Sequence, residues 1–150
     1  MAGRKNLAIP SPPKRKSGIP TGNAGEYFAM GELLRRGYDA QLADRNTKGY
    51  DLLVGRATDK ALRKVQVKSV RAGAWYVRTA SFEGTLLNQV TIYVLLGKED
   101  GQAPVRYFVV KNRTLAEKVS RQHGWDETAF VTLKSVKKFE NRWNVLGRPK

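Results

Sequence analysis

The chain of 150 residues contains no cysteine and only one histidine, His123. Without cysteine there is no disulfide framework and no thiolate zinc site, and one histidine cannot build a multi-histidine metal site. No apolar run approaches the roughly 20 residues that a membrane span needs. The first residues also lack the apolar core of a secretory signal. These absences favour a soluble protein of a reducing compartment, with the cytoplasm as the expected location.

Acidic residues are scarce. The chain has 28 Lys and Arg against 13 Asp and Glu, which gives a net charge of +15 and an isoelectric point near 10.3. A field of this size attracts polyanions, and nucleic acid is the commonest polyanion in cells. An acidic membrane surface is the rival partner, but no segment combines a basic face with an exposed apolar one. We therefore expect a nucleic-acid partner and no membrane.

The N-terminal segment differs in composition from the rest. Residues 1–25 contain five basic residues and no acidic one, and removing those five leaves 23 basic against 13 acidic residues, a net +10. Prolines at 10, 12, 13 and 20 and the cluster Lys14-Arg15-Lys16 predict a flexible basic arm over residues 1–22. The arm is either a solvated tail with weak phosphate affinity or a targeting signal. Residues 23–150 are expected to form a single domain.

The first helix is predicted from Asn23 to about Arg36. Asn23 suits the N-cap, Glu26 completes a capping box, and Gly37 suits the position after the last turn. At helical spacing the main apolar stripe, expected to be buried, comprises Ala24, Tyr27, Phe28, Gly31 and Leu34.

Strand-like segments follow this helix at residues 39–44, 50–54, 62–70, 75–79, 90–96, 105–110 and 130–133. A second capping box at Thr114 predicts a helix that ends before Gly124. Val136, Phe139 and Trp143 recur at helical spacing and predict a C-terminal amphipathic helix. The expected fold is α/β, with a mixed central β-sheet flanked by helices.

Three polar residues fall on two of these strands. Asp51 lies in a short hydrophobic strand, where an unpaired carboxylate is costly, and Gln66 and Lys68 share one face of the next. If the strands are neighbours, Asp51, Gln66 and the main-chain carbonyl of Val67 offer oxygen ligands to Mg²⁺, and Lys68 could orient a water beside a phosphate. The alternative is an exposed strand face carrying an Asp–Lys ion pair.

Glu26 lies at the edge of the apolar arc of the first helix. A carboxylate at a buried margin needs a partner, and a metal-bound water would provide one. The capping box would also satisfy Glu26 at the helix start without any catalytic role. The two interpretations are compatible.

Four segments follow one another along the first half of the chain: Asn23-Ala-Gly-Glu26-Tyr-Phe, Glu32-Leu-Leu-Arg-Arg-Gly-Tyr38, Asn46-Thr-Lys-Gly-Tyr-Asp51-Leu-Leu-Val and Val65-Gln-Val-Lys-Ser69. They resemble the first helix and catalytic hairpin of the PD-(D/E)XK nuclease superfamily, a restriction-endonuclease-like group. The likeness is closest to small restriction-endonuclease-like proteins and archaeal Holliday junction resolvases, and the C-terminal part is similar to an uncharacterised bacterial branch. It covers most of residues 21–147, with specific motifs in the first half.

The resemblance implies a phosphodiesterase that depends on Mg²⁺ or Mn²⁺. It makes Asp51 the metal-ligand aspartate, places Gln66 at the acidic position and Lys68 at the lysine, and matches Glu26 to a helix glutamate that binds metal through water. Tyr50 replaces the name-giving proline, a weak position. Gln66 replaces the usual carboxylate, and a neutral amide offers an oxygen without charge, so metal affinity should be lower.

Other candidates have plainer explanations. Trp75 and Tyr76 could stack on bases, although packing in a half-buried strand is favoured. His123 is expected to be a surface residue at a helix end. Basic side chains suited to phosphate contacts are Arg71, Arg78, Lys134, Lys137 and Lys138.

Three functions follow from the sequence. The first is a metal-dependent endonuclease, with DNA the favoured substrate. The second is a nuclease-like fold that binds nucleic acid without cutting it, and the third is a basic module that docks on an acidic protein. Resolvase-like relatives act as dimers, which makes a homodimer one expectation, and DNA binding would place the protein at the nucleoid.

Overall fold

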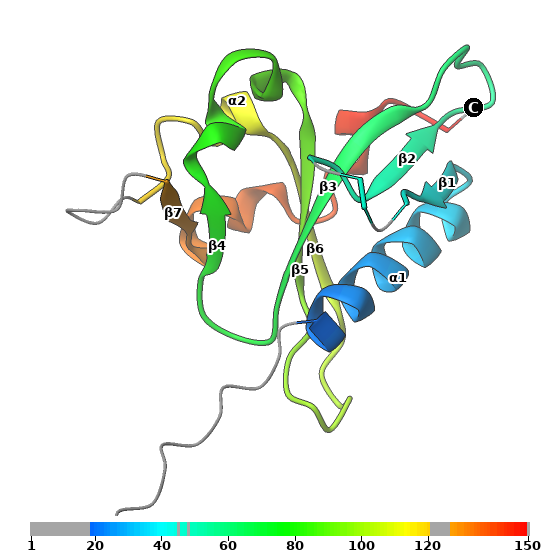
Figure 1. Ribbon diagram of the computed structural model, residues 1–150. Helices are drawn as coiled ribbons and strands as arrows, with labels where there is room; N and C mark the ends of the chain where they lie inside the picture. Colours follow the sequence, from blue (N-terminus) through cyan, green and yellow to red (C-terminus); the bar gives the residue numbers. More distant parts are fainter. Residues whose placement is uncertain (1–18, 45, 48, 121–126, 150) are drawn as a thin grey trace, which may run out of the picture.

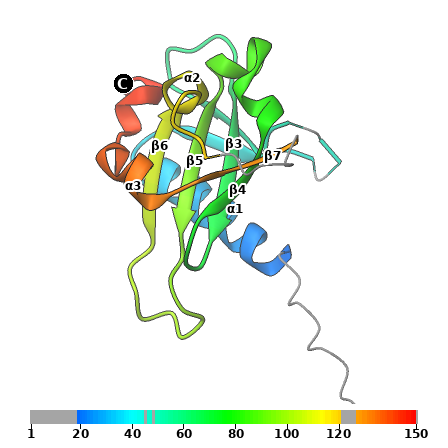
Figure 2. The ribbon, with the colours of Figure 1, turned by 90° about the vertical axis from the view of Figure 1, so that its left-hand side faces the viewer.

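The computed structural model describes residues 19–149 except 45, 48 and 121–126. Most of the predicted arm and His123 therefore lie outside the described residues. The described chain forms three layers, in which a five-stranded sheet has helix α1 on one face and a two-stranded sheet on the other (Figures 1 and 2). None of the helices described is both long and apolar enough to cross a bilayer.

The elements follow the strand pattern expected from the sequence, with shorter helices after α1. They are α1 (Ile19–Arg35), β1 (Asp39–Leu42), β2 (Leu52–Gly55), β3 (Arg63–Val70), β4 (Trp75–Arg78), β5 (Val90–Leu95), β6 (Arg106–Lys111), α2 (Asn112–Leu115), β7 (Thr128–Val131) and α3 (Leu133–Val136). Short 3₁₀ turns connect them: η2 (Thr79–Phe82), η3 (Gly84–Asn88), η4 (Lys137–Phe139) and η5 (Trp143–Leu146).

The central sheet is mixed, with strand order β1-β2-β3-β5-β6. β3 and β5 run parallel, whereas the other neighbours in this sheet are antiparallel. β4 and β7 form the second, antiparallel sheet. The predicted mixed α/β architecture is therefore confirmed.

β5 is apolar on both faces because both faces are covered. Ile92 and Val94 belong to the core cluster beneath α1, while Tyr93 between them belongs to the cluster beneath β4 and β7. Trp75 anchors this second cluster: it is 2% exposed, and its ring packs edge-on against Tyr93 and Phe108. The packing interpretation of Trp75 thus holds, whereas Tyr76 is exposed.

Helix α1 begins at Ile19, four residues before the predicted start, so the capping box at Asn23 was wrong. Pro20 is compatible with this earlier start because it lies in the first turn of the helix. Backbone N–H groups there have no acceptor within the helix, so the missing N–H of proline costs no hydrogen bond. Residues 19–22 consequently belong to the helix and not to the arm. The helix ends as predicted, with Gly37 at φ +90° and the Tyr38 N–H bonded to the Leu33 carbonyl.

The face that α1 buries also differs from the predicted one. The buried residues are Gly25, Ala29 and Leu33, whereas Tyr27, Phe28 and Leu34 are about half exposed. The apolar stripe was a poor guide because two of the three buried positions, Gly25 and Ala29, are small residues that pack closely but contribute little to a hydrophobicity pattern.

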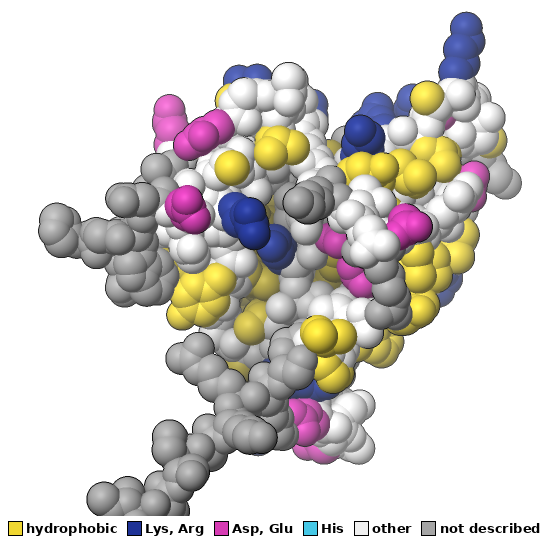
Figure 3. Space-filling model, viewed as in Figure 1, with side chains coloured by type: hydrophobic (Ala, Val, Ile, Leu, Met, Phe, Trp, Pro, Cys, Tyr) yellow, Lys and Arg dark blue, Asp and Glu magenta, His cyan; other side chains and the backbone are white. Residues whose placement is uncertain are grey.

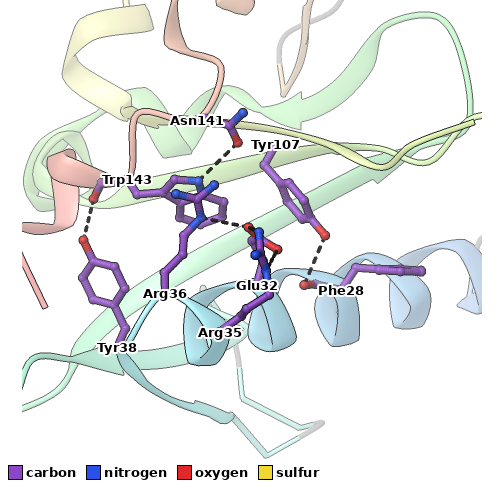
Figure 4. Close-up of polar contacts among 8 residues, drawn as sticks. All are labelled: Phe28, Glu32, Arg35, Arg36, Tyr38, Tyr107, Asn141 and Trp143. Atoms are coloured by element: carbon purple, nitrogen blue, oxygen red, sulfur yellow. Dashed lines mark hydrogen bonds and ion pairs between the residues drawn. The ribbon is translucent and has the colours of Figure 1, made fainter.

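Polar contacts join α1 to the C-terminal segment (Figure 4). Glu32 forms ion pairs with Arg35 and Arg36, and the Arg36 guanidinium lies over the Trp143 ring, 5.1 Å from its centroid. The Tyr38 hydroxyl donates to the Trp143 carbonyl, as Figure 4 shows. It shares its one proton with the Gly147 carbonyl. These contacts hold the C-terminal segment against α1 and the edge of the sheet.

Two further helix predictions were wrong in length. The helix predicted from Thr114 is the single turn α2, which begins at Asn112. The predicted C-terminal helix is divided into α3, η4 and η5, and Asn141 with φ 56° lies between η4 and η5. Val136 and Trp143, which suggested one helix face, are buried in different core clusters. Their spacing reflects a chain that wraps around the sheet edge and covers both faces.

Candidate active site

The candidate site lies where β2 separates from β3. Pairing between these strands ends at Leu52 and Val65, followed by one last backbone bond from the Asp51 N–H to the Val65 carbonyl (2.9 Å). Beyond it, the Val67 N–H has no carbonyl of β2 to meet and donates instead to Oδ2 of Asp51 at 2.8 Å. The Asp51 carboxylate thus takes the place of a backbone acceptor at the point where the strands diverge.

Gln66 binds the same carboxylate oxygen. Its Nε2 donates to Oδ2 of Asp51 at 2.8 Å. Oδ1 of Asp51 and Oε1 of Gln66 accept no hydrogen bond from the described residues. Two oxygens, one charged and one neutral, consequently stay available to a ligand.

Lys68 lies two residues further along β3, on the same face as Gln66. Its side chain is partly buried, and the desolvation of the ammonium lowers its pKa from the ordinary value of 10.5. The negative charge of Asp51 opposes this shift, and the positive charge of Arg78 reinforces it. Lys68 is therefore a cation held in a costly environment beside a carboxylate, a pattern common at functional sites.

Glu26 belongs to α1, which packs on the other face of β3, the face of Val65 and Val67. The preceding residue, Gly25, lies so close to Ser69 that an added Cβ would be 1.6 Å from the Ser69 Oγ. That Oγ is buried without a hydrogen-bond partner among the described residues. Glu26 is partly exposed and has a polar or electrostatic partner of its own. The Gly25–Ser69 contact fixes where the N-terminal part of α1 lies against β3.

The donor set suits a hard divalent cation that is weakly held. Backbone N–H and C=O groups of one residue point to the same side of a strand, so the Val67 carbonyl faces the gap left by β2. With Asp51 Oδ1 and Gln66 Oε1 it makes three oxygen donors of the kind that Mg²⁺ takes. No cluster of three or more His, Cys, Asp or Glu side chains occurs in the described part of the chain. A single carboxylate anchors these three donors, so weak metal affinity is expected.

The basic residues predicted to contact nucleic acid do not form one surface. Arg78 is exposed at the end of β4 and acts on Lys68. Arg71 and Lys134 instead line a separate, mostly apolar pocket of about 660 Å³ at the far end of β3 and β5. Lys137 and Lys138 are exposed on η4, where the Lys138 ammonium lies 5.3 Å from the centre of the Phe139 ring.

Sequence reasoning missed a second basic group close to Asp51. The Lys64 ammonium lies 5.1 Å from the centre of the Tyr50 ring, one residue before Asp51. A signal for it existed, because strand alternation places Lys64 on the face of Gln66 and Lys68. The unpartnered Ser69 Oγ had no signal in the sequence, since it depends on how closely α1 approaches β3.

No family model matches the chain, and no curated protein matches it in sequence. Solved structures that are similar to it in fold include two nucleases. A Holliday junction resolvase of the archaeal hyperthermophile Archaeoglobus fulgidus has a TM-score of 0.55 at 15% identity, over 85% of this chain and 96% of the resolvase. The bacterial homing endonuclease I-Ssp6803I has a TM-score of 0.52 at 17% identity, over 88% of this chain and 92% of the endonuclease. The chain therefore has a restriction-endonuclease-like fold.

Proposed function

We propose that the protein is a divalent-metal-dependent endonuclease that hydrolyses phosphodiester bonds in nucleic acid, with DNA as the favoured substrate. The observation that carries the proposal is the Asp51 carboxylate, held by Val67 and Gln66 next to the partly buried Lys68. Two structures with this fold are a junction resolvase and a homing endonuclease. The net charge of +15 supports a polyanionic substrate.

In this proposal the oxygens of Asp51, Gln66 and the Val67 carbonyl hold Mg²⁺ or Mn²⁺, with Glu26 contributing through a water. The bound ion would act as a Lewis acid on a phosphate oxygen and lower the pKa of a water. Hydrolysis adds water across one P–O bond and yields a phosphate monoester and a hydroxyl.

Lys68 supplies the fixed positive charge of the site. Its ammonium offsets the negative charge that builds on the phosphate as water attacks, and it can orient that water through its N–H donors. Partial burial strengthens this interaction because the surrounding dielectric is lower than that of bulk water.

The test is cleavage of supercoiled, nicked and branched DNA with Mg²⁺ or Mn²⁺. Asp51→Asn keeps an oxygen that can accept the Val67 N–H bond but removes the charge, and Lys68→Gln removes the ammonium. We expect each to lower the cleavage rate at least a hundredfold, whereas Asp39→Asn, an exposed carboxylate on β1, leaves it unchanged. Cleavage that survives both site variants, in protein that melts like the wild type, would contradict the assignment.

A second candidate is a protein that binds nucleic acid without cutting it. The supporting observation is the hydrogen bond from Gln66 to Asp51, which lets a neutral side chain occupy the acidic position as a purely structural partner. This candidate predicts salt-sensitive DNA binding that needs no divalent ion.

The variant Gln66→Glu separates the two candidates. It places a second carboxylate beside Asp51 and so strengthens any cation site. A gain in Mn²⁺ binding by calorimetry together with faster cleavage supports the endonuclease. Unchanged metal binding and no cleavage by either protein supports the binding function.

Assembly and location remain predictions. A homodimer is testable by sedimentation velocity of the full chain, with and without DNA. Location in the cytoplasm at the nucleoid is testable by imaging a fluorescent fusion in cells.

A further inference from the structure

A basic cleft of about 640 Å³ opens beside the candidate site, at the end of the sheet where β3 and β5 begin. One wall is η3, through Thr85, Leu86 and Asn88, and the other is the chain around Tyr50 and the start of β3. Gln89 connects the two walls, because its Nε2 donates to the Gly49 carbonyl at 2.7 Å. The cleft is therefore a built feature of the fold and not a gap between mobile side chains.

Among the described residues, the cleft is lined by three cationic side chains and no carboxylate. Arg63, Lys64 and Lys111 are exposed, and none forms an ion pair with an acidic residue in the described parts of the chain. Arg63 helps to lower the pKa of the Asp59 carboxyl through its positive charge. Asp59, however, forms its ion pair with Arg56 and not with Arg63. Figure 3 shows Lys and Arg side chains gathered over the upper part of the β2–β3 hairpin. Uncompensated positive charge in a concave site favours an anionic ligand.

Polar donors accompany these cations. The Lys64 ammonium is held over the Tyr50 ring, which limits its freedom before a ligand arrives. Asn88 accepts from Arg113 through Oδ1, which leaves its amide N–H groups free to donate. Hydrogen-bond donors beside fixed cations suit phosphate oxygens.

The cleft adjoins the candidate site through residues next to it in the chain. Tyr50 precedes Asp51 in the chain, and Val65, which also lines the cleft, accepts the Asp51 N–H bond. Lys64 lies on the same strand face as Gln66, about 7 Å away at the usual rise of a strand. A strand of nucleic acid with one phosphate at Asp51 would therefore pass its neighbouring phosphates into the cleft.

We propose that this cleft binds the backbone phosphates of the nucleic-acid strand next to the bond that is cut, through Arg63, Lys64 and Lys111. The inference rests on the proposed function and deepens it by assigning the path of the substrate strand. It moves the main contact surface away from Arg71 and Lys134, because their pocket is mostly apolar and lies at the opposite end of the sheet.

The experiment measures binding of fluorescein-labelled DNA by the full chain in EDTA, from 50 to 300 mM NaCl, with a 20-nucleotide single strand and a 20-base-pair duplex. The double variant Lys64→Gln/Lys111→Gln removes two cations of the cleft. The matched control Lys98→Gln/Lys118→Gln removes the same charge from exposed positions outside it. EDTA separates binding from cleavage, so the cleft is tested whether or not the protein cuts.

We expect the cleft variant to bind roughly tenfold more weakly at 50 mM NaCl, with a salt slope reduced by about 1.8 on the duplex and about 1.4 on the single strand, the values for two lost phosphate contacts. The control should keep a slope near that of the wild type. Loss on both probes supports a backbone site, and loss on the single strand alone identifies an unpaired strand as its occupant.

A cleft variant that binds both probes like the control would overturn the proposal while leaving the endonuclease function in place, provided that the wild type cuts DNA and Asp51→Asn does not. A wild-type chain that binds neither probe at 50 mM NaCl would overturn both. Thermal melts of the two double variants check that each is folded.

Discussion

At the scale of single residues, Lys68 is the side chain whose environment departs most from that of an ordinary surface lysine. Folding transfers its ammonium into a partly buried position, and this desolvation lowers its pKa below 10.5. At a pH where Lys68 is charged in both the folded and the unfolded chain, the full desolvation penalty of its ammonium opposes folding. Between the lowered pKa and 10.5 the unfolded chain binds more protons, so stability rises with pH across that window.

We therefore predict that Lys68→Met is more stable than the wild type at pH 7, and that the difference shrinks as the pH approaches 10.5. Urea unfolding at pH 7, 9 and 10.5 measures it. The control is Lys64→Met, an exposed lysine on the same strand face, which should show no such pH-dependent gain. A Lys68→Met protein less stable than Lys64→Met at pH 7 would show that the Asp51 attraction outweighs desolvation.

Much of the candidate site could be predicted from the sequence at this scale. Spacing and strand alternation predicted that Asp51, Gln66 and Lys68 converge, and the structure places them together. Spacing could not show that one oxygen of Asp51 accepts both bonds, because that depends on where β2 stops pairing. The cleft cations also escaped prediction, since Lys111 meets Arg63 and Lys64 only through the order of the strands.

At the scale of elements, the docking of α1 depends on a glycine. Gly25 lies against Ser69 with no room for a Cβ, whereas Gly31 on the same helix has nothing within 4 Å of that position. Helix propensity alone would favour alanine at both positions by up to about 1 kcal/mol. Packing opposes an alanine only at position 25.

We predict that Gly25→Ala destabilises the protein by about 1–3 kcal/mol, the usual cost of overpacking a tight contact. Gly31→Ala should leave stability unchanged or raise it slightly. The double change Gly25→Ala/Ser69→Gly should recover most of the loss, because it removes the Oγ that the new methyl group meets. Urea denaturation of the four proteins measures this, and equal behaviour of the two single variants would exclude a tight α1–β3 contact.

Element prediction from sequence succeeded for strands and failed for helix faces and helix lengths. Strands β2, β5 and β6 are apolar enough to be recognised locally, and β3 is recognised by its alternation of apolar and polar residues. The buried face of α1 includes Gly25 and Ala29 beside Leu33, and a hydrophobic pattern gives little weight to the two small residues. The C-terminal turns were mistaken for one helix because Val136 and Trp143 have helical spacing while facing different clusters.

At the scale of the whole molecule, charge is spread over the domain as well as its N-terminal residues. Residues 1–18 contain five of the 28 basic residues and no acidic residue, so their removal leaves 23 basic against 13 acidic residues, a net +10. The cleft cations all lie in the part that remains.

We predict that a chain lacking residues 1–18 still folds and still binds DNA in low salt, with an affinity lowered by no more than about tenfold. Fluorescence anisotropy in EDTA measures binding, and a thermal melt checks folding. The control is the full chain with the five basic residues of that segment replaced by glutamine. Complete loss of binding in the shortened chain would place the main contact in residues 1–18 and not in the domain.

The divergence of β2 from β3 also has a consequence for how such a protein changes over generations. Because the Asp51 carboxylate replaces a missing backbone acceptor for Val67, folding alone gives selection a reason to keep an aspartate there. Lys68 has no such second role, and its burial works against stability. A lineage that stopped using the site would be expected to lose Lys68 early and Asp51 late. Among descendants of this chain, the residue at position 68 would therefore be the better record of continued use.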